Sequence, residues 1–339
     1  GIDMIRMGII GGGTMGAIFA RLIAEHHLTE LVGICDRDEN TAARLAAEWE
    51  VSGKVNAEEL FDVEGINAVY IATPDFAHTD LVLEAIDRGL HVLVEKPLTM
   101  SLDEAMELEK KLDETQLKGM VRFGNRFSPP FSVVKNAIAS GRHGQVISLK
   151  GCLNDSIIVP TKMLSWSAST TPGWFLLSHV LDLAYWFVDS RVVSVYANGI
   201  KSKLVKLGID TYDTIQISVQ YENGAIGQFE STWVLPESIP QIFDMGFEIV
   251  CEDGAFKVNT HEQMVISMAD RYTYPSTLMT EVTGNLQGYL KYSLDAFVDC
   301  IVNGEKPSPI PFADGVENVK VLEALHRSLE TGQVVSLTS

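Results

Sequence analysis

A histidine and an aspartate stand in the otherwise apolar stretch TPGWFLLSHVLDLAYWF, residues 171–187. Thr171 and Pro172 offer a hydroxyl cap and a proline at the first helical position, so the pattern predicts a helix. His179 and Asp182 are three residues apart and would share one face of that helix. Histidine can serve as a base near neutral pH, and a buried aspartate needs a partner. The pair therefore either performs chemistry or is satisfied inside the core.

A glycine-rich segment near the N-terminus predicts a dinucleotide site. IRMGII, residues 5–10, is an apolar strand, and GGGTMG then leads into an amphipathic helix, so Gly11, Gly13 and Gly16 fit G-x-G-x-x-G. In that motif the first glycine allows a tight turn, the second lets the backbone approach a pyrophosphate, and the third allows close helix–strand packing. Asp36 ends the next strand, LVGICD, where a carboxylate would accept the hydroxyls of an adenosine ribose.

Strands and helices continue to alternate as far as Phe127, through TAARLAAEW, INAVYIATP, HTDLVLEAIDRGL, HVLVEKP and GMVRFGNRF. This alternation predicts an α/β domain with a doubly wound parallel sheet, which binds ligands at the carboxyl ends of its strands. The groups at those ends are Gly11–Gly16, Asp36, Thr73-Pro74-Asp75, Glu95-Lys96-Pro97 and Asn125-Arg126. We expect all of them to border one crevice.

After Phe127 short strands separated by turns predict an α+β domain. Pro129–Ser140 is expected as a helix, and the expected strands are VISLKGCL, VVSVYANG, TIQISVQY, AIGQFESTW, FEIVC, AFKVN and MVISM. They would form a large, mainly antiparallel open sheet, covered on one face by the 171–187 helix and by helices near 287–303 and 314–333. The predicted domains are residues 1–126 and 127–339. The polar loops 154–170 and 270–286 either border a ligand or are ordinary connections.

Composition narrows the class of protein. The hydrophobic fraction of 46% and charged fraction of 21% are typical of a soluble globular protein, and a net charge of −19 argues against nucleic acid or an anionic membrane as partner. Four scattered cysteines predict reduced thiols in a cytoplasmic protein. No His, Cys or acidic spacing is typical of a metal site, so we expect no metal. The adjacent His26 and His27 are expected at a solvated helix end.

The motifs GGGTMG, ATPDFAH, EKP, NRFSP, HVLDLAYW and NGEKPSPIPFADGVENVKVLEALHRSLETG follow one another along nearly the whole chain. Together with Asp36 they resemble the Gfo/Idh/MocA family of nicotinamide-dependent oxidoreductases. The resemblance implies an N-terminal dinucleotide-binding domain and hydride transfer between NAD(P) and a secondary hydroxyl of a sugar, cyclitol or related polyol. NAD is expected rather than NADP, because Asp36 would repel the 2′-phosphate, although the adjacent Arg37 could partly accommodate it.

The same resemblance implies roles for individual residues. Lys96 would lie beside the nicotinamide ribose and the reacting hydroxyl, and His179 would be the active-site histidine that removes the hydroxyl proton. Two departures from the family pattern are Phe175, where an aspartate is frequent, and Asp75, where the motif has asparagine. The predicted catalytic residues are Lys96 and His179, and the predicted substrate-binding residues are Asp182, Phe175, Arg126 and Trp166. The predicted cofactor-binding residues are Gly11, Gly13, Thr14, Met15, Gly16, Asp36, Arg37, Thr73, Pro74, Asp75, His78, Glu95, Lys96 and Asn125.

The sequence also predicts an oligomer and leaves two alternative functions open. A sheet covered on one face would expose alternating Val, Ile and Phe side chains on the other, which predicts a homodimer or homotetramer. The alternatives to a dehydrogenase are a glycosidase-like or epimerising enzyme with tightly bound NAD, and a non-catalytic sensor of a dinucleotide or sugar. Retention of Lys96 and His179 favours catalysis, whereas Phe175 keeps the sensor alternative open.

Overall fold

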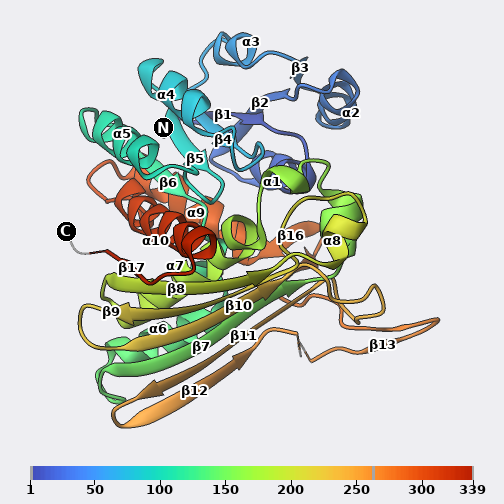
Figure 1. Ribbon diagram of the computed structural model, residues 1–339. Helices are drawn as coiled ribbons and strands as arrows, with labels where there is room; N and C mark the ends of the chain where they lie inside the picture. The colour runs from blue at the N-terminus through green and yellow to red at the C-terminus, as the bar shows by residue number, and fades with distance from the viewer. Residues whose placement is uncertain (1–2, 262–263, 338–339) are drawn as a thin grey trace. The chain divides into compact units, whose positions relative to one another are not determined.

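The computed structural model describes residues 3–261 and 264–337, which form two compact units (Figure 1). The first unit combines Gly1–Gly124 with Met279–Val316, and the second combines Asn125–Leu278 with Glu317–Ser339. The sequence predicts a single division at residue 126. In the structure, the segment that begins at Met279 returns to the first unit, because its helix packs against the N-terminal fold.

The first unit contains a six-stranded sheet in which every pair of neighbouring strands is parallel. The strands are β1 (Ile5–Ile10), β2 (Thr29–Cys35), β3 (Ser52–Lys54), β4 (Ala68–Ile71), β5 (His91–Val94) and β6 (Gly119–Val121). Their order, β3-β2-β1-β4-β5-β6, is that of a doubly wound dinucleotide-binding fold. The predicted parallel α/β sheet is confirmed, and its central strands are almost wholly apolar because both faces are covered.

Three helices of the first unit, α2 (Glu39–Trp49), α3 (Ala57–Phe61) and α5 (Leu102–Asp113), begin at side-chain caps with acidic residues in the first turn. The others are α1 (Thr14–Glu25), α4 (Thr79–Asp87) and α9 (Tyr289–Val302), the last following the hairpin β15 (Met279–Val282) and β16 (Asn285–Gly288). Asp38 caps α2 by accepting from the backbone N–H groups of Asn40 and Thr41, and Ser101 caps α5.

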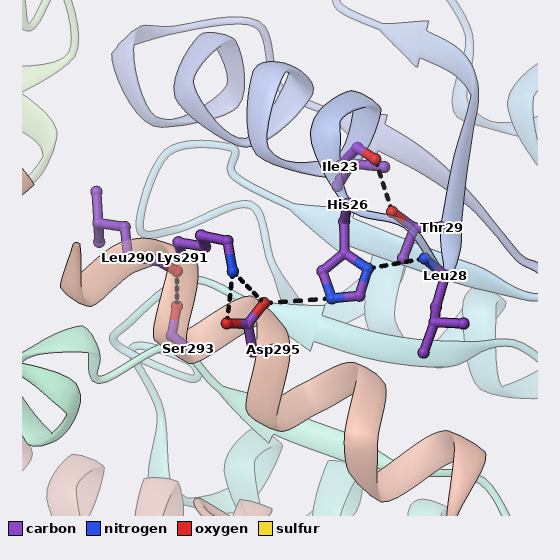
Figure 2. Close-up of polar contacts among 8 residues, drawn as sticks. All are labelled: Ile23, His26, Leu28, Thr29, Leu290, Lys291, Ser293 and Asp295. Atoms are coloured by element: carbon purple, nitrogen blue, oxygen red, sulfur yellow. Dashed lines mark hydrogen bonds and ion pairs between the residues drawn. The ribbon is translucent and has the colours of Figure 1, made fainter. Parts of the chain in front are cut away.

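A polar cluster joins the end of α1 to α9 (Figure 2). His26 accepts the Leu28 backbone N–H at Nδ1 (3.0 Å), and its Nε2 lies 3.2 Å from Asp295 Oδ1. Burial opposes the negative charge on Asp295, but hydrogen bonds from His26 and Lys291 lower the pKa of its carboxyl below the ordinary value. The expectation of a solvated His26 is wrong, because this side chain is buried against α9.

The second unit contains a seven-stranded sheet of order β12-β11-β7-β10-β9-β8-β17. Its strands are β7 (Val146–Asp155), β8 (Val192–Ile200), β9 (Thr214–Tyr221), β10 (Ile226–Thr232), β11 (Phe243–Cys251), β12 (Gly254–Asn259) and β17 (Val335–Ser336). All neighbouring pairs are antiparallel except β10 with β7, which confirms the predicted, mainly antiparallel sheet. Of the predicted strand MVISM, only Ser267–Met268 (β13) is extended, and it pairs with Tyr272–Thr273 (β14) outside this sheet.

The helices of the second unit include two π-helical turns. The helical segments are η1 (Gly124–Phe127), α6 (Pro129–Ala139), η2 (Val159–Met163), η3 (Ser167–Ser169), η4 (Gly173–Leu177), α7 (Ser178–Val188), α8 (Lys203–Lys206) and α10 (Phe312–Thr331). The segments η2 and η4 are the π-helical turns. The first residues of η1 and α10 belong to the first unit. The 171–187 helix and the helix near 314–333 are present as predicted, whereas the helix near 287–303 belongs to the first unit.

The exposed face of the seven-stranded sheet is mainly polar. One row across five strands consists of Tyr196, Ser218, Gln228, Lys150 and Glu248, all exposed. The Val, Ile and Phe side chains of these strands mostly point to the opposite face and are buried, because successive side chains alternate along a strand. The expectation of an exposed face lined with Val, Ile and Phe is therefore wrong.

Two further findings concern the whole described chain. Among residues 3–261 and 264–337, every helix falls short of the length and apolar character that crossing a bilayer requires. Cys35, Cys152, Cys251 and Cys300 are all free thiols.

Candidate active site

The turn between β1 and α1 uses its glycines for different reasons. Gly11 has φ +103°, and a Cβ there would lie 2.4 Å from the carbonyl oxygen of Ala72. A Cβ at Gly16 would lie 1.8 Å from the carbonyl oxygen of Gly11. A Cβ at Gly13, in contrast, would meet nothing within 4 Å. The protein's own packing requires Gly11 and Gly16, whereas Gly13 leaves open space of the kind that a close pyrophosphate needs.

The start of α1 and the end of β2 supply complementary polar groups. The start of α1 has no side-chain cap, so the backbone N–H groups of its first turn are not used by a capping side chain and suit an anion. Asp36 follows β2 and is fixed by two backbone donors: the Gly12 N–H lies 2.7 Å from Oδ2, and the Asp38 N–H lies 2.8 Å from Oδ1. Arg37 is exposed. This arrangement fits a dinucleotide with its adenosine ribose at Asp36.

His78 links the loop after β4 to the loop that carries Lys96. Its side chain is buried, with Nδ1 2.8 Å from the Pro97 carbonyl oxygen and Nε2 3.1 Å from the Thr73 carbonyl oxygen. The Thr73 hydroxyl donates to the Ala77 carbonyl in the same turn. The structure therefore places the His78 ring between two backbone segments of the predicted cofactor site.

Glu95, next to Lys96, pairs with Arg122 inside the first unit. Arg122 donates through both Nε and Nη2 to the two carboxylate oxygens, with Nη2 2.6 Å from Oε1, and both side chains are buried. Burial would lower the pKa of Arg122, but the negative charge of Glu95 raises it. Asp75 and Lys96 are also buried, at 4% and 7% exposed. The spacing of E-K-P gave no signal for this partner, which lies 27 residues away.

The helix that carries His179 is anchored at its start. The Trp174 backbone N–H donates to Thr171 Oγ1 (3.2 Å), which is the predicted cap. Thr171 Oγ1 also lies 2.6 Å from Nε2 of His326, whose Nδ1 lies 2.7 Å from the Leu322 carbonyl oxygen. Burial lowers the pKa of His326 to about 4, so at neutral pH the ring donates from Nδ1 and accepts the Thr171 hydroxyl proton at Nε2.

His179 and Asp182 of α7 each contact one of two adjacent residues of η1. Asn125 Nδ2 lies 3.3 Å from His179 Nδ1. Arg126 forms a forked ion pair with Asp182, with Nε 2.9 Å from Oδ2 and Nη2 2.6 Å from Oδ1, and both side chains are buried. His179 itself is half-buried. Two residues that are three positions apart on α7 are thus contacted by two adjacent residues of η1. Asn125 lies 54 positions before His179 in the sequence.

Phe175 and Trp166 form one aromatic cluster with Trp233. The Phe175 ring lies 5.8 Å from Trp166 and 5.5 Å from Trp233 between centroids. Trp233 is fully buried and donates its indole N–H to Asp155 Oδ2 (3.2 Å). Phe175 and Trp166 are half-buried, so part of this apolar surface remains accessible. The loop 154–170 therefore contributes at least Trp166 to the surroundings of the α7 segment.

The predicted site residues thus form two groups. The first unit brings together the glycine turn and Asp36, and it joins the Thr73 loop to the Lys96 loop through His78. The second unit brings together Asn125, Arg126, His179 and Asp182, with Phe175 and Trp166 in an aromatic cluster. Within the described part of the chain, no three His, Cys, Asp or Glu side chains are grouped as a metal site would need.

Comparison with known protein families identifies the family of the chain. A family model described as "Oxidoreductase family, NAD-binding Rossmann fold" matches residues 5–123, and the GFO/IDH/MocA C-terminal domain matches residues 131–257. The chain belongs to the Gfo/Idh/MocA family. The predictions of an oxidoreductase, of a Rossmann-type first domain and of NAD as cofactor are confirmed.

Individual members of the Gfo/Idh/MocA family match over nearly the full length. The chain is 26% identical to a scyllo-inositol 2-dehydrogenase (NAD(+)) of Bacillus subtilis, covering 98% of this chain and 96% of the relative. It is 28% identical to an inositol 2-dehydrogenase of Rubrobacter xylanophilus, covering 97% and 92%. The structure of scyllo-inositol dehydrogenase from Lactobacillus casei with bound NAD(H) and scyllo-inositol has the same fold, with a TM-score of 0.84, 18% identity and coverage of 99% and 100%.

Proposed function

We propose that this Gfo/Idh/MocA oxidoreductase transfers a hydride between NAD and a secondary hydroxyl of a cyclitol or a closely related sugar. The observation that carries the proposal is the polar stripe of α7, in which His179 contacts Asn125 and Asp182 pairs with Arg126. A base and a fixed carboxylate on one helix face suit a substrate with several hydroxyls. Relatives named for inositol substrates, which match over more than nine-tenths of the chain, support the substrate class.

The residues of the first unit suit NAD. The open space at Gly13 and the uncapped start of α1 would receive the pyrophosphate, and Asp36 would receive the adenosine ribose. When bound, NAD supplies the hydride acceptor. The Lys96 ammonium would bind the substrate oxygen and stabilise its developing negative charge.

The second unit would supply the base and the substrate contacts. His179 would take the hydroxyl proton, because loss of a hydride from a carbinol carbon needs the O–H proton to leave as well. Asp182 is held by Arg126 and would accept a neighbouring substrate hydroxyl. Phe175 and Trp166 would form an apolar wall, backed by the buried Trp233, which favours a substrate with a less polar or bulkier substituent on that side.

A direct assay tests the function. Purified protein with NAD is mixed with a panel of inositols and sugars, and NADH absorbance is followed. We expect turnover with at least one cyclitol, and His179→Ala and Lys96→Ala should each lower kcat by about 100-fold or more with NAD affinity and melting temperature nearly unchanged. NAD binding without reduction by any substrate would instead support the sensor alternative, and product formation without net NADH would support the epimerising or glycosidase-like one.

We also propose that the protein is a homodimer or homotetramer. Support comes from the β13–β14 hairpin, which extends away from the seven-stranded sheet in Figure 1 and exposes Ile266, Met268 and Tyr272 by 56%, 72% and 65%. An isolated two-stranded hairpin is marginally stable in water, and exposed apolar clusters mark interfaces. The charged residues of this hairpin are Asp270 and Arg271, whose opposite charges cancel. A second copy of this acidic protein can therefore pack there without electrostatic repulsion.

Light scattering tests the assembly. The parent should have the mass of a dimer or tetramer, and the double variant Met268→Ser, Tyr272→Ser should have a lower mass, while Ile226→Ser on the polar sheet face should not change it. A monomeric parent would refute the proposal. The free thiols support a cytoplasmic location, which cell fractionation can check.

A further inference from the structure

We infer that Asn125 is a positioning residue that selects the tautomer of His179, with its side-chain carbonyl accepting from Nδ1–H so that Nε2 is the basic nitrogen. The inference rests on the proposed function, in which His179 removes a hydroxyl proton. It starts from one contact, the 3.3 Å approach of the Asn125 amide nitrogen Nδ2 to His179 Nδ1, and it turns the amide by half a turn so that Oδ1 takes that place. It also assigns Asn125, predicted as a cofactor ligand, to the histidine.

The amide of Asn125 can face the ring in two ways that occupy the same space, because its oxygen and nitrogen exchange places on a half-turn. If Nδ2–H donates to Nδ1, the neutral ring must carry its proton on Nε2, and Nε2 then has no lone pair with which to take another. If Oδ1 accepts from Nδ1–H, Nε2 keeps its lone pair. Only the second arrangement lets His179 act as a base through Nε2.

The second arrangement also holds throughout proton transfer. The O–H bond of the substrate breaks, an N–H bond forms at Nε2, and the ring becomes a cation that carries a proton on both nitrogens. Asn125 Oδ1 accepts from Nδ1–H before and after this step, so no second proton has to move. Because the amide is neutral, it stabilises the cation less than a carboxylate would.

Asn125 is held in place by its surroundings. Its backbone carbonyl accepts the Ser128 N–H (3.1 Å) just after η1. The next residue, Arg126, pairs with Asp182 on α7 through two hydrogen bonds. The short helix η1 is thus joined to α7 at two points, which fixes the amide against the imidazole.

Charged side chains on η1, on α7 itself, and on α6 and β7, which pack against α7, have hydrogen-bond partners within the second unit. Asp182 on α7 and Arg126 on η1 neutralise each other. Lys135 on α6 donates to the Trp186 carbonyl, and Asp155 at the end of β7 accepts from the Trp233 indole. A negative charge introduced at position 125 would lie directly against Nδ1 of the ring.

Two variants and a matched control test the assignment through pH profiles of kcat/KM. In Asn125→Asp the carboxylate still accepts from Nδ1–H but favours the cation, so the acidic limb should move up by about one pH unit or more, with turnover retained above it. In Asn125→Leu kcat should fall about 10- to 100-fold, with NAD affinity little changed. Asn198→Asp adds the same charge on the exposed sheet face and should leave the profile in place. An unchanged limb in Asn125→Asp would overturn the inference.

A second measurement does not depend on turnover. In protein labelled with ¹⁵N-histidine, ring signals of His179 are identified as those missing from His179→Gln, and their shifts report which nitrogen carries the proton. We expect Nδ1 protonated in the parent, and a mixture of tautomers in Asn125→Leu. A parent ring protonated at Nε2 would refute the inference. A parent that turns over no substrate yet has the expected tautomer would refute the proposed function alone.

Discussion

The glycine turn of the first unit and the polar stripe of α7 in the second unit present their functional groups in opposite ways. Around Gly11, Gly13 and Gly16 the groups are backbone N–H donors and open space, produced by one short turn; of these three glycines, only Gly11 packs against a distant residue, Ala72. On α7 the groups are the side chains of His179 and Asp182, whose partners lie 54 and 56 positions earlier. A site built from backbone groups therefore depends mostly on residues that are close together in the sequence. A site built from side chains depends on which distant segments the fold brings together.

Each unit also contains a buried arginine–carboxylate pair next to a site residue. Glu95 precedes Lys96 and pairs with Arg122, and Arg126 follows Asn125 and pairs with Asp182. The first pair supports a loop, while the second belongs to the polar stripe itself. Variants of the two pairs therefore separate support of the fold from support of the reaction.

The largest effects should come from breaking these pairs. Arg122→Met and Arg126→Met should each lower the free energy of unfolding by about 3–5 kcal/mol, because each leaves a buried carboxylate unpaired. Urea denaturation measures this. Arg126→Met should also raise KM for the polyol, since it frees Asp182, whereas Arg126→Lys should cost less stability. A loss below about 1 kcal/mol for both methionine variants would show that the carboxylates find other partners.

Within the glycine turn, two substitutions of the same kind should behave differently. Gly16→Ala places a methyl group against a backbone carbonyl and should cost about 3 kcal/mol of stability. Gly13→Ala meets open space and should keep the parent melting temperature while weakening NAD binding by about tenfold, or about 1.4 kcal/mol. Calorimetry and NAD titration check both. Equal stability losses at the two positions would remove the distinction between packing and ligand glycines.

The anchor of the α7 segment should be sensitive to acid. His326 has a pKa of about 4 in the folded protein, and about 6.5 when unfolded, so the unfolded state gains a proton first as the pH falls. Its contribution to stability is therefore complete above pH 6.5 and is lost between pH 6.5 and 4, by up to about 3 kcal/mol. Unfolding free energies of the parent minus those of His326→Gln, measured across this range, should fall accordingly. A difference that is constant with pH would contradict the assignment.

The smallest effect concerns cofactor choice. Asp36 is proposed to receive the adenosine ribose, where its charge would repel the 2′-phosphate of NADP, so Asp36→Ser should shift the ratio of catalytic efficiencies with NAD and NADP toward NADP by about tenfold. Arg37 is exposed next to it and is available for the phosphate. Steady-state kinetics with both cofactors provide the ratio. Equal efficiency in the parent would show that Asp36 does not discriminate.

Sequence reasoning succeeded where local rules apply. The glycine spacing predicted the turn between β1 and α1, the alternation of strands and helices predicted the parallel sheet, and Thr171 was recognised as a helix cap. It was wrong about His26, because a helix end is exposed only if nothing distant covers it, and α9 does. It was also wrong about the exposed sheet face, because composition alone does not say which side of each strand is buried.

The sequence by itself determined most of the helices and strands, the glycine turn, and the places of Lys96, His179 and Asp182 along them, since these depend on backbone conformation and on spacing within a few residues. Only the tertiary structure decided the partners: Asn125 for His179, Arg126 for Asp182, Arg122 for Glu95 and His326 for Thr171. The physical reason is that a buried polar group must find a partner wherever the packed chain offers one. Pairing across 27 to 155 positions leaves no periodic trace in the sequence.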